Sequence, residues 1–261
     1  IIKTWSEGEV SDWVDGEKPD LKNPRTVLGC LLSGKRVEEI NQYLLKQNAV
    51  GTAGSRWLLN PKGGYNFTTM ALTPVLYLFD AKPELLYPAT KKHLVENILT
   101  IEGSGFKRNV PGLPMEDTEN HILMAESSRY LKNQWRWENG NKSPEFDNKN
   151  NGVEAGLYDY LKEVYTFGMY EFNADPYLGY SYSALLNLNA FAKGGIKEMA
   201  TKILDLINWQ YALNSYQFKH FPPYRRRFKK DFRKEIVSDY HSVMLMVWAG
   251  FYNDSLKIDL S

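Results

Sequence analysis

Cysteine is almost absent from this sequence, which has one, Cys30, among 261 residues. A single cysteine cannot form an intramolecular disulfide and cannot build a cysteine-cluster metal site. Its scarcity leaves the compartment open, because many secreted and periplasmic proteins also lack disulfides. Long hydrophobic runs are missing too. No apolar run in the sequence approaches the roughly 20 residues that a helix needs to cross a bilayer, so we expect no membrane span.

An excess of charge of one sign is also missing. The 32 Lys and Arg residues face 31 Asp and Glu residues, which gives a net charge of +1 at pH 7. Such a chain has no overall field to attract nucleic acid or an anionic membrane. One local exception is residues 219–234, where basic residues alternate with Phe and Tyr. This run could bind a polyanion or could be a solvated basic loop, and it is the sole argument for a nucleic-acid partner.

Helical periodicity dominates what the sequence does contain. Apolar residues recur at helical spacing over segments of about 12 to 18 residues, with short Gly and Pro connections and no alternating strand pattern. We therefore predict an all-α fold of antiparallel helical hairpins, with an irregular lead-in over residues 1–23 and a single domain over 24–261. The predicted helices cover residues 26–32, 37–47, 67–79, 83–101, 118–137, 152–167, 176–192, 196–213 and 242–251, with a loop over 103–114 and an exposed excursion over 138–152.

One predicted helix start carries an unusual set of polar groups. Asp117 or Thr118 is placed to act as the N-cap, and Glu119, Asn120 and His121 then fall in the first turn. Free N–H groups and the positive end of the helix dipole favour an anion there. A carboxylate, an amide and an imidazole in this turn indicate a site. The same three residues are also compatible with ordinary roles in capping and hydrogen bonding.

A second helix start is polar in a similar way. Glu171 and Asn173 precede it, Asp175 and the following proline resemble an N-cap and a first helical residue, and Tyr177 and Tyr180 come next. We predict that the two helix starts lie close together in the folded chain. The aromatic content of 14%, with 17 Tyr and 7 Trp, fits either a carbohydrate-binding cleft or a large helical core.

The two helix starts and the hairpin rhythm resemble the (α/α) toroid superfamily, which includes many polysaccharide lyases and six-hairpin glycosidases. The resemblance is carried by Thr118-Glu119-Asn120-His121, by Tyr170-Glu171-Phe172-Asn173 with Pro176-Tyr177, and by Ala184-Leu185-Leu186-Asn187-Leu188. As a fold it covers residues 24–251. It implies an (α/α) toroid or an incomplete toroid, since fewer helices are predicted than a closed ring of six hairpins requires. It also implies a possible origin in a longer polypeptide.

Toroid lyases characteristically combine an Asn, a His and a Tyr, often with an Arg, in one cleft. By this resemblance Asn120, aided by Arg129 or Arg56, would neutralise a uronate carboxylate, and His121 would be the base. Tyr180 would protonate the leaving oxygen or share the base role. The product would arise by β-elimination from an acidic polysaccharide. Further substrate contacts are predicted for Arg56, Trp57, Arg129, Asn173, Tyr177, Tyr240 and His241.

Two other functions remain open at this point. A glycoside hydrolase would use a carboxylate pair, with Glu119 and either Glu171 or Asp175 as acid and base. A non-catalytic glycan-binding or scaffolding domain would rely on the aromatic residues and the basic run. We expect no cofactor and no metal. We also expect a secreted or periplasmic location, because the chain begins with Ile1 rather than methionine, as a processed product does.

Overall fold

The protein is mostly helical, which confirms the predicted all-α class. Contacts along the chain divide it into two compact units, Ile1–Glu154 and Ala155–Ser261. In the part of the chain that is described, no helix is long and apolar enough to cross a membrane. The single toroid-like domain stays a prediction. The computed structural model describes residues 2–10, 22–47, 65–100, 107–110, 113–116, 118–174, 177–217, 219–221 and 223–225.

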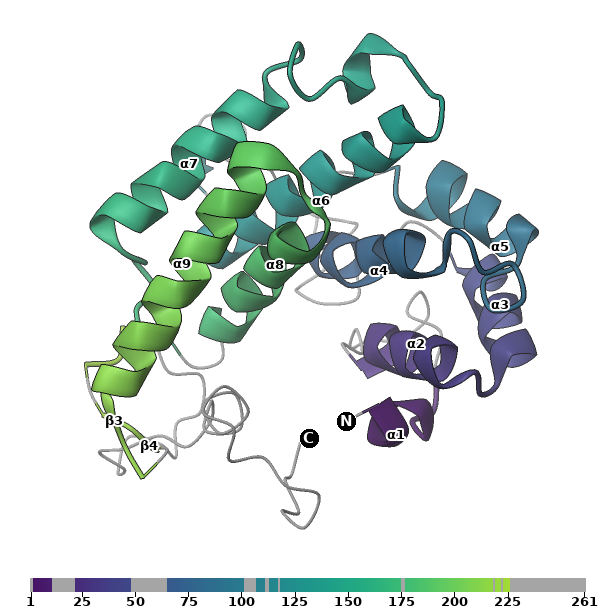
Figure 1. Cartoon of the computed structure of the whole chain (residues 1–261), viewed down its shortest axis with the longest axis horizontal. Helices are drawn as coiled ribbons and strands as arrows, with labels where there is room; N and C mark the ends of the chain where they lie inside the picture. The colour runs from purple at the N-terminus through teal and green to yellow at the C-terminus, as the bar shows by residue number, and fades with distance from the viewer. Residues whose placement is uncertain are drawn as a thin grey trace. The chain divides into compact units, whose positions relative to one another are not determined.

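The first unit packs helices around an apolar core. In Figure 1, α1 lies against α2, and α4 lies against α6. The core side chains include Leu31, Ile40, Leu44, Leu72, Leu76, Phe79, Leu94 and Ile98. The elements of this unit are α1 (Ile2–Ser6), α2 (Lys22–Ser33), α3 (Val37–Lys46), α4 (Tyr65–Phe79), α5 (Pro88–His93), the π-helix η1 (Leu94–Ile98), β1 (Lys107–Val110), β2 (Leu113–Glu116), α6 (Glu119–Glu138) and the 3₁₀ helix η2 (Pro144–Phe146).

The helix α1 replaces part of the irregular lead-in that the sequence predicts. It packs so closely on α2 that a Cβ on Gly29 would lie 2.6 Å from the Cβ of Trp5 and 2.9 Å from the backbone nitrogen of Ser6. Only glycine permits this approach. The Cys30 thiol, which is fully buried, donates to the Ser6 carbonyl at 3.4 Å. The lead-in gave no periodic signal because a five-residue helix is too short to show one.

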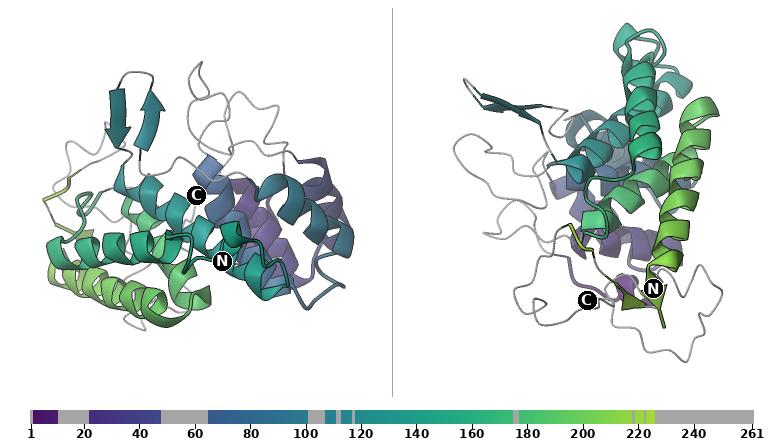
Figure 2. Two further views of the ribbon diagram at one scale, coloured as in Figure 1. Left: turned by 90° about the horizontal axis from the view of Figure 1, so that it is seen from above. Right: turned by 90° about the vertical axis from the view of Figure 1, so that its left-hand side faces the viewer.

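A second correction concerns residues 103–114, which the sequence predicts as a loop. Strands β1 and β2 pair antiparallel there, with Lys107 opposite Glu116 and Val110 opposite Leu113. Figure 2 shows this hairpin projecting from the helices of the first unit. Pro111-Gly112 between the strands is a turn signal that the sequence carried. Four-residue strands that include Pro114 gave no alternating pattern to accompany it.

Helices α4 and α6 run parallel rather than antiparallel. Residues near their starts meet, since Asn66 contacts His121, and residues about three turns later meet as well. There the Tyr77 hydroxyl donates to the Leu131 carbonyl at 2.7 Å and accepts from the Gln134 amide at 3.1 Å. The segment between them, with α5 and η1, returns the chain to the same end. Both helix N-termini therefore lie at one end of the pair.

The excursion over residues 138–152 is largely exposed, as predicted, but it is anchored at one point. Asn148 is 7% exposed, and its amide donates to the Tyr130 carbonyl at 2.8 Å. Its oxygen accepts from the Asn133 amide at 3.0 Å. These bonds hold the excursion against the middle of α6.

The second unit consists of α7 (Val153–Phe167, of which the first two residues belong to the first unit), α8 (Tyr177–Phe191), α9 (Gly194–Leu213), β3 (Ser215–Tyr216) and β4 (Lys219–His220). Helices α8 and α9 form a hairpin joined by two residues, and α7 runs beside α9 (Figures 1 and 2). A Cβ on Gly195 would lie 3.3 Å from the ring of Tyr158. The pair α8–α9 is the kind of short helical hairpin that the sequence predicts.

Candidate functional site

Helix α6 begins where the sequence predicts, with Thr118 as its N-cap residue. The backbone of Thr118 is extended, with φ −74° and ψ 153°, and its carbonyl accepts from the backbone N–H of Ile122 at 3.0 Å. Its side chain makes no capping hydrogen bond. Glu119, Asn120 and His121 therefore occupy the first turn, as predicted. The side chain of Asn120 is fully buried, whereas Glu119 and His121 are partly exposed.

The imidazole of His121 is held by α4. The amide nitrogen of Asn66 lies 2.9 Å from Nδ1 of His121, and the Phe67 ring stands edge-on to the imidazole with the ring centres 5.4 Å apart. An amide nitrogen can only donate, so this contact requires Nδ1 to accept. A neutral His121 then carries its proton on Nε2. Asn66 and Phe67 thus hold the ring in place, and the orientation of the Asn66 amide decides which ring nitrogen carries the proton.

Two buried polar atoms at the start of α4 have no hydrogen-bond partner among the described residues. They are Oδ1 of Asn66 and the hydroxyl of Tyr65, and both residues are at least 97% buried. Burial also raises the pKa of the Tyr65 hydroxyl, so the phenol stays protonated at neutral pH. Buried polar groups without partners are rare in proteins and often mark a place where a ligand or water binds. We call Tyr65, Asn66, Asn120 and His121, which lie in the first turns of α4 and α6, the α4–α6 polar cluster.

Tyr65 and Asn66 are functional candidates that sequence reasoning missed. The predicted helix began at Phe67, so both residues fell into the preceding loop. A signal was present, since Gly63-Gly64 directly precedes them and places a phenol and an amide at a helix start. That pattern resembles the α6 start but contains no charged residue.

Arg129 lies on α6 away from the polar cluster. It follows His121 by eight residues, which places it about 12 Å further along the helix and about 80° around it. Its guanidinium is 3.8 Å from the Glu126 carboxylate. A role for Arg129 beside His121 stays a prediction. What the structure shows is Arg129 at the edge of a different feature.

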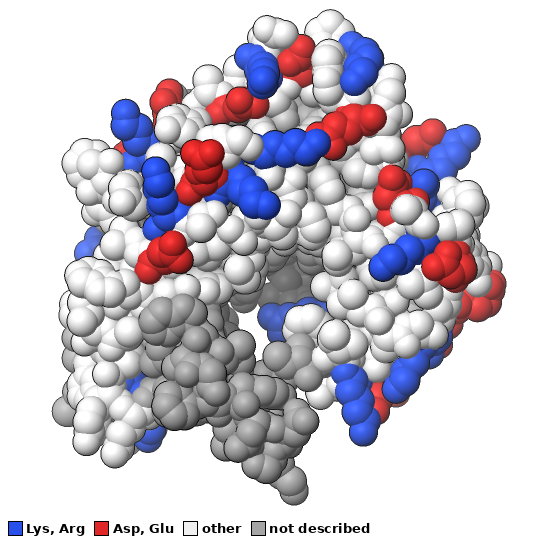
Figure 3. Space-filling view, in the orientation of Figure 1, with Lys and Arg blue, Asp and Glu red and all other residues white. Residues whose placement is uncertain are grey.

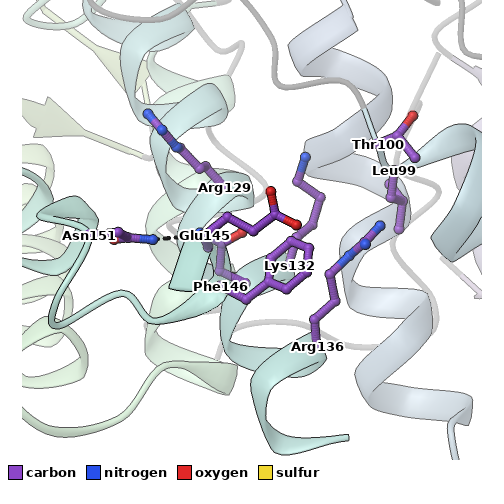
Figure 4. A pocket seen from close by; sticks show the side chains of 9 residues that line it. Leu99, Thr100, Arg129, Lys132, Arg136, Glu145, Phe146 and Asn151 are labelled. Carbon is purple, nitrogen blue, oxygen red and sulfur yellow. Dashed lines mark hydrogen bonds between the residues drawn. The ribbon is translucent and has the colours of Figure 1, made fainter. Parts of the chain in front are cut away.

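That feature is a hollow of about 470 Å³ in the first unit, which we call the cationic hollow (Figure 4). Three cations from α6, Arg129, Lys132 and Arg136, line it together with Glu145 and Phe146 from η2. Lys132 is only 4% exposed. No local pattern in the sequence predicts this hollow, because η2 and α6 meet there only where the excursion folds back.

The second predicted helix start lies in the second unit. Glu171 is 3% exposed, and Asn173 has a left-handed backbone with φ 51°. The rings of Tyr177 and Tyr180 pack edge to face with their centres 6.3 Å apart. A cavity of only about 10 Å³ lies beside Asn173, which is room for about one water molecule. Glu171 and Asn173 are therefore buried just before this helix.

The beginning of the basic run fastens the loop before α8. The amide of Asn173 donates to the Pro223 carbonyl at 3.3 Å, and the backbone N–H of Arg225 donates to the Phe172 carbonyl at 3.0 Å. The Arg225 guanidinium lies 4.3 Å from the centre of the Tyr170 ring and donates to the Tyr170 hydroxyl. Residues 219–221 and 223–225 are thus anchored to this loop, although Lys219 and Arg225 are exposed.

Several predicted residues lie outside the described part of the chain. These are Arg56, Trp57, Asp117, Asp175, Tyr240 and His241, and also the basic run beyond Arg225. The two polar helix starts belong to different units. Their predicted meeting therefore stays a prediction, and so do the roles proposed for Tyr180, Glu171 and Tyr177.

Charges of both signs are interspersed over the face shown in Figure 3, as the net charge of +1 leads one to expect. Among the described residues, no group of three or more His, Cys, Asp or Glu side chains is placed to hold a metal ion. The α4–α6 polar cluster itself contains an imidazole, two amides and a phenol.

Comparison with known proteins returned no relative. No family model matches the sequence, and no curated protein and no solved structure matches it either. The resemblance to the (α/α) toroid superfamily stays a prediction.

Proposed function

We propose that this protein cleaves a uronate-containing polysaccharide by β-elimination, with the α4–α6 polar cluster at the reacting centre. The observation that supports this most directly is the convergence of two parallel helix N-termini on the Asn66–His121 pair. Each N-terminus places the positive end of a helix dipole there. Together they favour a negative charge where the amide and the imidazole meet.

β-Elimination needs a site that favours negative charge. A base removes the proton from the carbon beside the uronate carboxylate, negative charge spreads onto that carboxylate, and the bond to the 4-linked sugar then breaks. Hydrogen-bond donors fixed around the carboxylate lower this barrier, because they stabilise the charge as it develops. His121, with its proton on Nε2, is one such donor, and Asn120 in the same turn is a second candidate.

The proton position on His121 decides which role it plays. As a base, Nε2 needs a free lone pair, and it has one only when the proton sits on Nδ1. That tautomer requires Asn66 to present its oxygen to Nδ1 by rotating its amide, and this oxygen has no partner among the described residues. Asn66 is therefore a positioning residue that selects between donor and base. Tyr65, whose hydroxyl has no partner among the described residues, is a candidate proton donor to the leaving oxygen.

The first experiment is incubation with a panel of uronate-containing polysaccharides. Ultraviolet absorbance reports the unsaturated uronate end that elimination creates, and an assay of reducing ends reports every cleaved bond. Both signals rise together if the proposal holds. Reducing ends without absorbance identify a hydrolase and contradict the proposal. Binding without either signal identifies a glycan-binding domain and contradicts it as well.

His121→Gln tests the reacting centre, with His93→Gln as the matched control. We expect His121→Gln to lower turnover about 100-fold or more, which is the usual effect of removing a group that stabilises developing charge. His93 bonds the Gln47 carbonyl at 2.9 Å, so His93→Gln changes a structural contact only. Equal turnover in the two variants would rule out His121. Circular dichroism of both variants shows whether each is folded.

A further inference from the structure

The cationic hollow is large enough and charged enough to hold a small ligand. Its volume of about 470 Å³ lies within the range typical of small-molecule sites. Three cations and one carboxylate line it, and Arg129 also lies 3.8 Å from the Glu126 carboxylate. The hollow is built entirely from the first unit, and it lies along α6 from His121 by about 12 Å or more. It is therefore a feature separate from the α4–α6 polar cluster.

The three cations form one stripe of α6. Arg129, Lys132 and Arg136 are spaced by three and four residues, so their side chains leave the helix on neighbouring sides. Lys132 is 4% exposed and lies at depth, whereas the side chain of Arg129 is 40% exposed. A buried ammonium group is expensive to desolvate and is found where anions surround it. The stripe thus places one exposed and one buried cation beside the hollow.

The side chain of Arg136 is held by two contacts within the first unit. Its guanidinium donates to the Val95 carbonyl in the last turn of η1, where helical donors run out, and lies 4.8 Å from the centre of the Phe146 ring. Burial lowers the pKa of Arg136, with Glu145 and Glu96 opposing the change, and a guanidinium remains charged nonetheless. Arg136 therefore supplies fixed charge at one wall.

Glu145 is the carboxylate of the hollow. Its side chain extends between Arg129 and Lys132 in the view of Figure 4. Its backbone carbonyl is held by the amides of Asn151 at 2.7 Å and Asn133 at 3.3 Å, but the residue itself is exposed. The side chain can therefore turn outward while the backbone stays in place.

We infer that the cationic hollow binds a small oxyanion, a carboxylate, sulfate or phosphate group, among Arg129, Lys132 and Arg136, which line it together with the Glu145 carboxylate. Arginine pairs with such groups through two parallel N–H bonds, and a buried lysine adds a point charge. Glu145 competes with the ligand. Binding at the hollow needs no turnover at His121.

The test is calorimetric titration of the whole chain with sodium sulfate, sodium phosphate and sodium glucuronate, at constant ionic strength set with NaCl because salt screens exposed charges. Arg129→Gln should weaken binding about tenfold, as the loss of one charge-assisted hydrogen bond does. Glu145→Gln should tighten binding several-fold by removing the competing charge. Arg25→Gln, an exposed arginine on α2, is the matched control and should leave affinity unchanged.

Opposite effects at Arg129 and Glu145 are the signature of the proposal, since a merely structural role for either residue does not strengthen anion binding. The preferred ion identifies the source, because glucuronate binding points to a sugar acid and binding of sulfate or phosphate alone points to an inorganic ion.

Absence of saturable binding for all three ions overturns the inference. So does an equal loss in Arg129→Gln and Arg25→Gln, or weaker binding in Glu145→Gln. If Arg129→Gln does not fold, Glu145→Gln still tests the inference, because Glu145 is exposed and its substitution is tolerated more easily. A protein inactive on every polysaccharide can still bind the ion, so the two proposals fail separately.

Discussion

At the scale of single residues, the contact with most chemical consequence joins Asn66 to His121, and no local rule predicts it. The two residues are 55 positions apart, whereas capping and periodicity act within a few turns of one helix. Sequence reasoning found Asn120 and His121 because the chemistry of a helix start is local. It missed Asn66 and Tyr65 because their significance depends on which helix packs beside them.

The Asn66 contact leads to a prediction for the pKa of His121. In Asn66→Asp a carboxylate replaces the amide 2.9 Å from Nδ1, and an adjacent opposite charge favours the imidazolium form. We expect the pKa of His121 to rise by about 1 or more, measured by nuclear magnetic resonance titration of the ring. Because the raised value belongs to the folded state, the variant should be relatively more stable at pH 6 than at pH 9.

The chain contains its own control for that experiment. Asn97 donates to Nδ1 of His93 at 3.1 Å, in an exposed setting. Asn97→Asp creates the same pair in contact with water, where screening weakens it. Asn97→Asp should therefore change the pH dependence of stability less than Asn66→Asp does. Equal changes in the two variants would show that the Asn66–His121 contact is not buried in solution.

At the scale of elements, strong periodicity predicted helices well. Residues 67–79 and 152–167 were predicted, and α4 (Tyr65–Phe79) and α7 (Val153–Phe167) match them within two residues. The π-helix η1 and the β1–β2 hairpin were not predicted. A π-helix differs from an α-helix by one residue per turn over a single turn, which side-chain spacing barely registers. The hairpin strands are too short to show an alternating pattern.

The space around two helical glycines, Gly29 on α2 and Gly156 on α7, predicts opposite effects of an alanine substitution on stability. Gly29→Ala places a Cβ against the backbone of α1, and we expect a loss of about 1 to 3 kcal/mol in the free energy of unfolding. Gly156→Ala lies in α7 with open space around the new Cβ, and helix propensity should raise the same quantity by about 0.5 to 1 kcal/mol. Urea denaturation measures both. A Gly29→Ala variant as stable as the parent would mean that α1 is not packed on α2 in solution.

At the scale of the whole molecule, composition and periodicity sufficed for the all-α class but not for the arrangement of the helices. The sequence predicts antiparallel hairpins, and α8–α9 is one. The parallel α4–α6 pair arises because α5 and η1 carry the chain back between them. Such an arrangement depends on contacts between distant segments, so periodicity within each helix does not specify it. The toroid stays a prediction for the same reason.

The thiol of Cys30, the one cysteine in the chain, has a consequence for measurement. It is fully buried under α1, and burial raises its pKa, so two effects keep the reactive thiolate away from solvent. A disulfide reagent should label the native chain slowly, at a rate that urea and Gly29→Ala both increase and that spectrophotometry follows. Immediate labelling of the native chain would contradict the packing. The modification rate of one sulfur atom therefore reports how often the N-terminal helices separate.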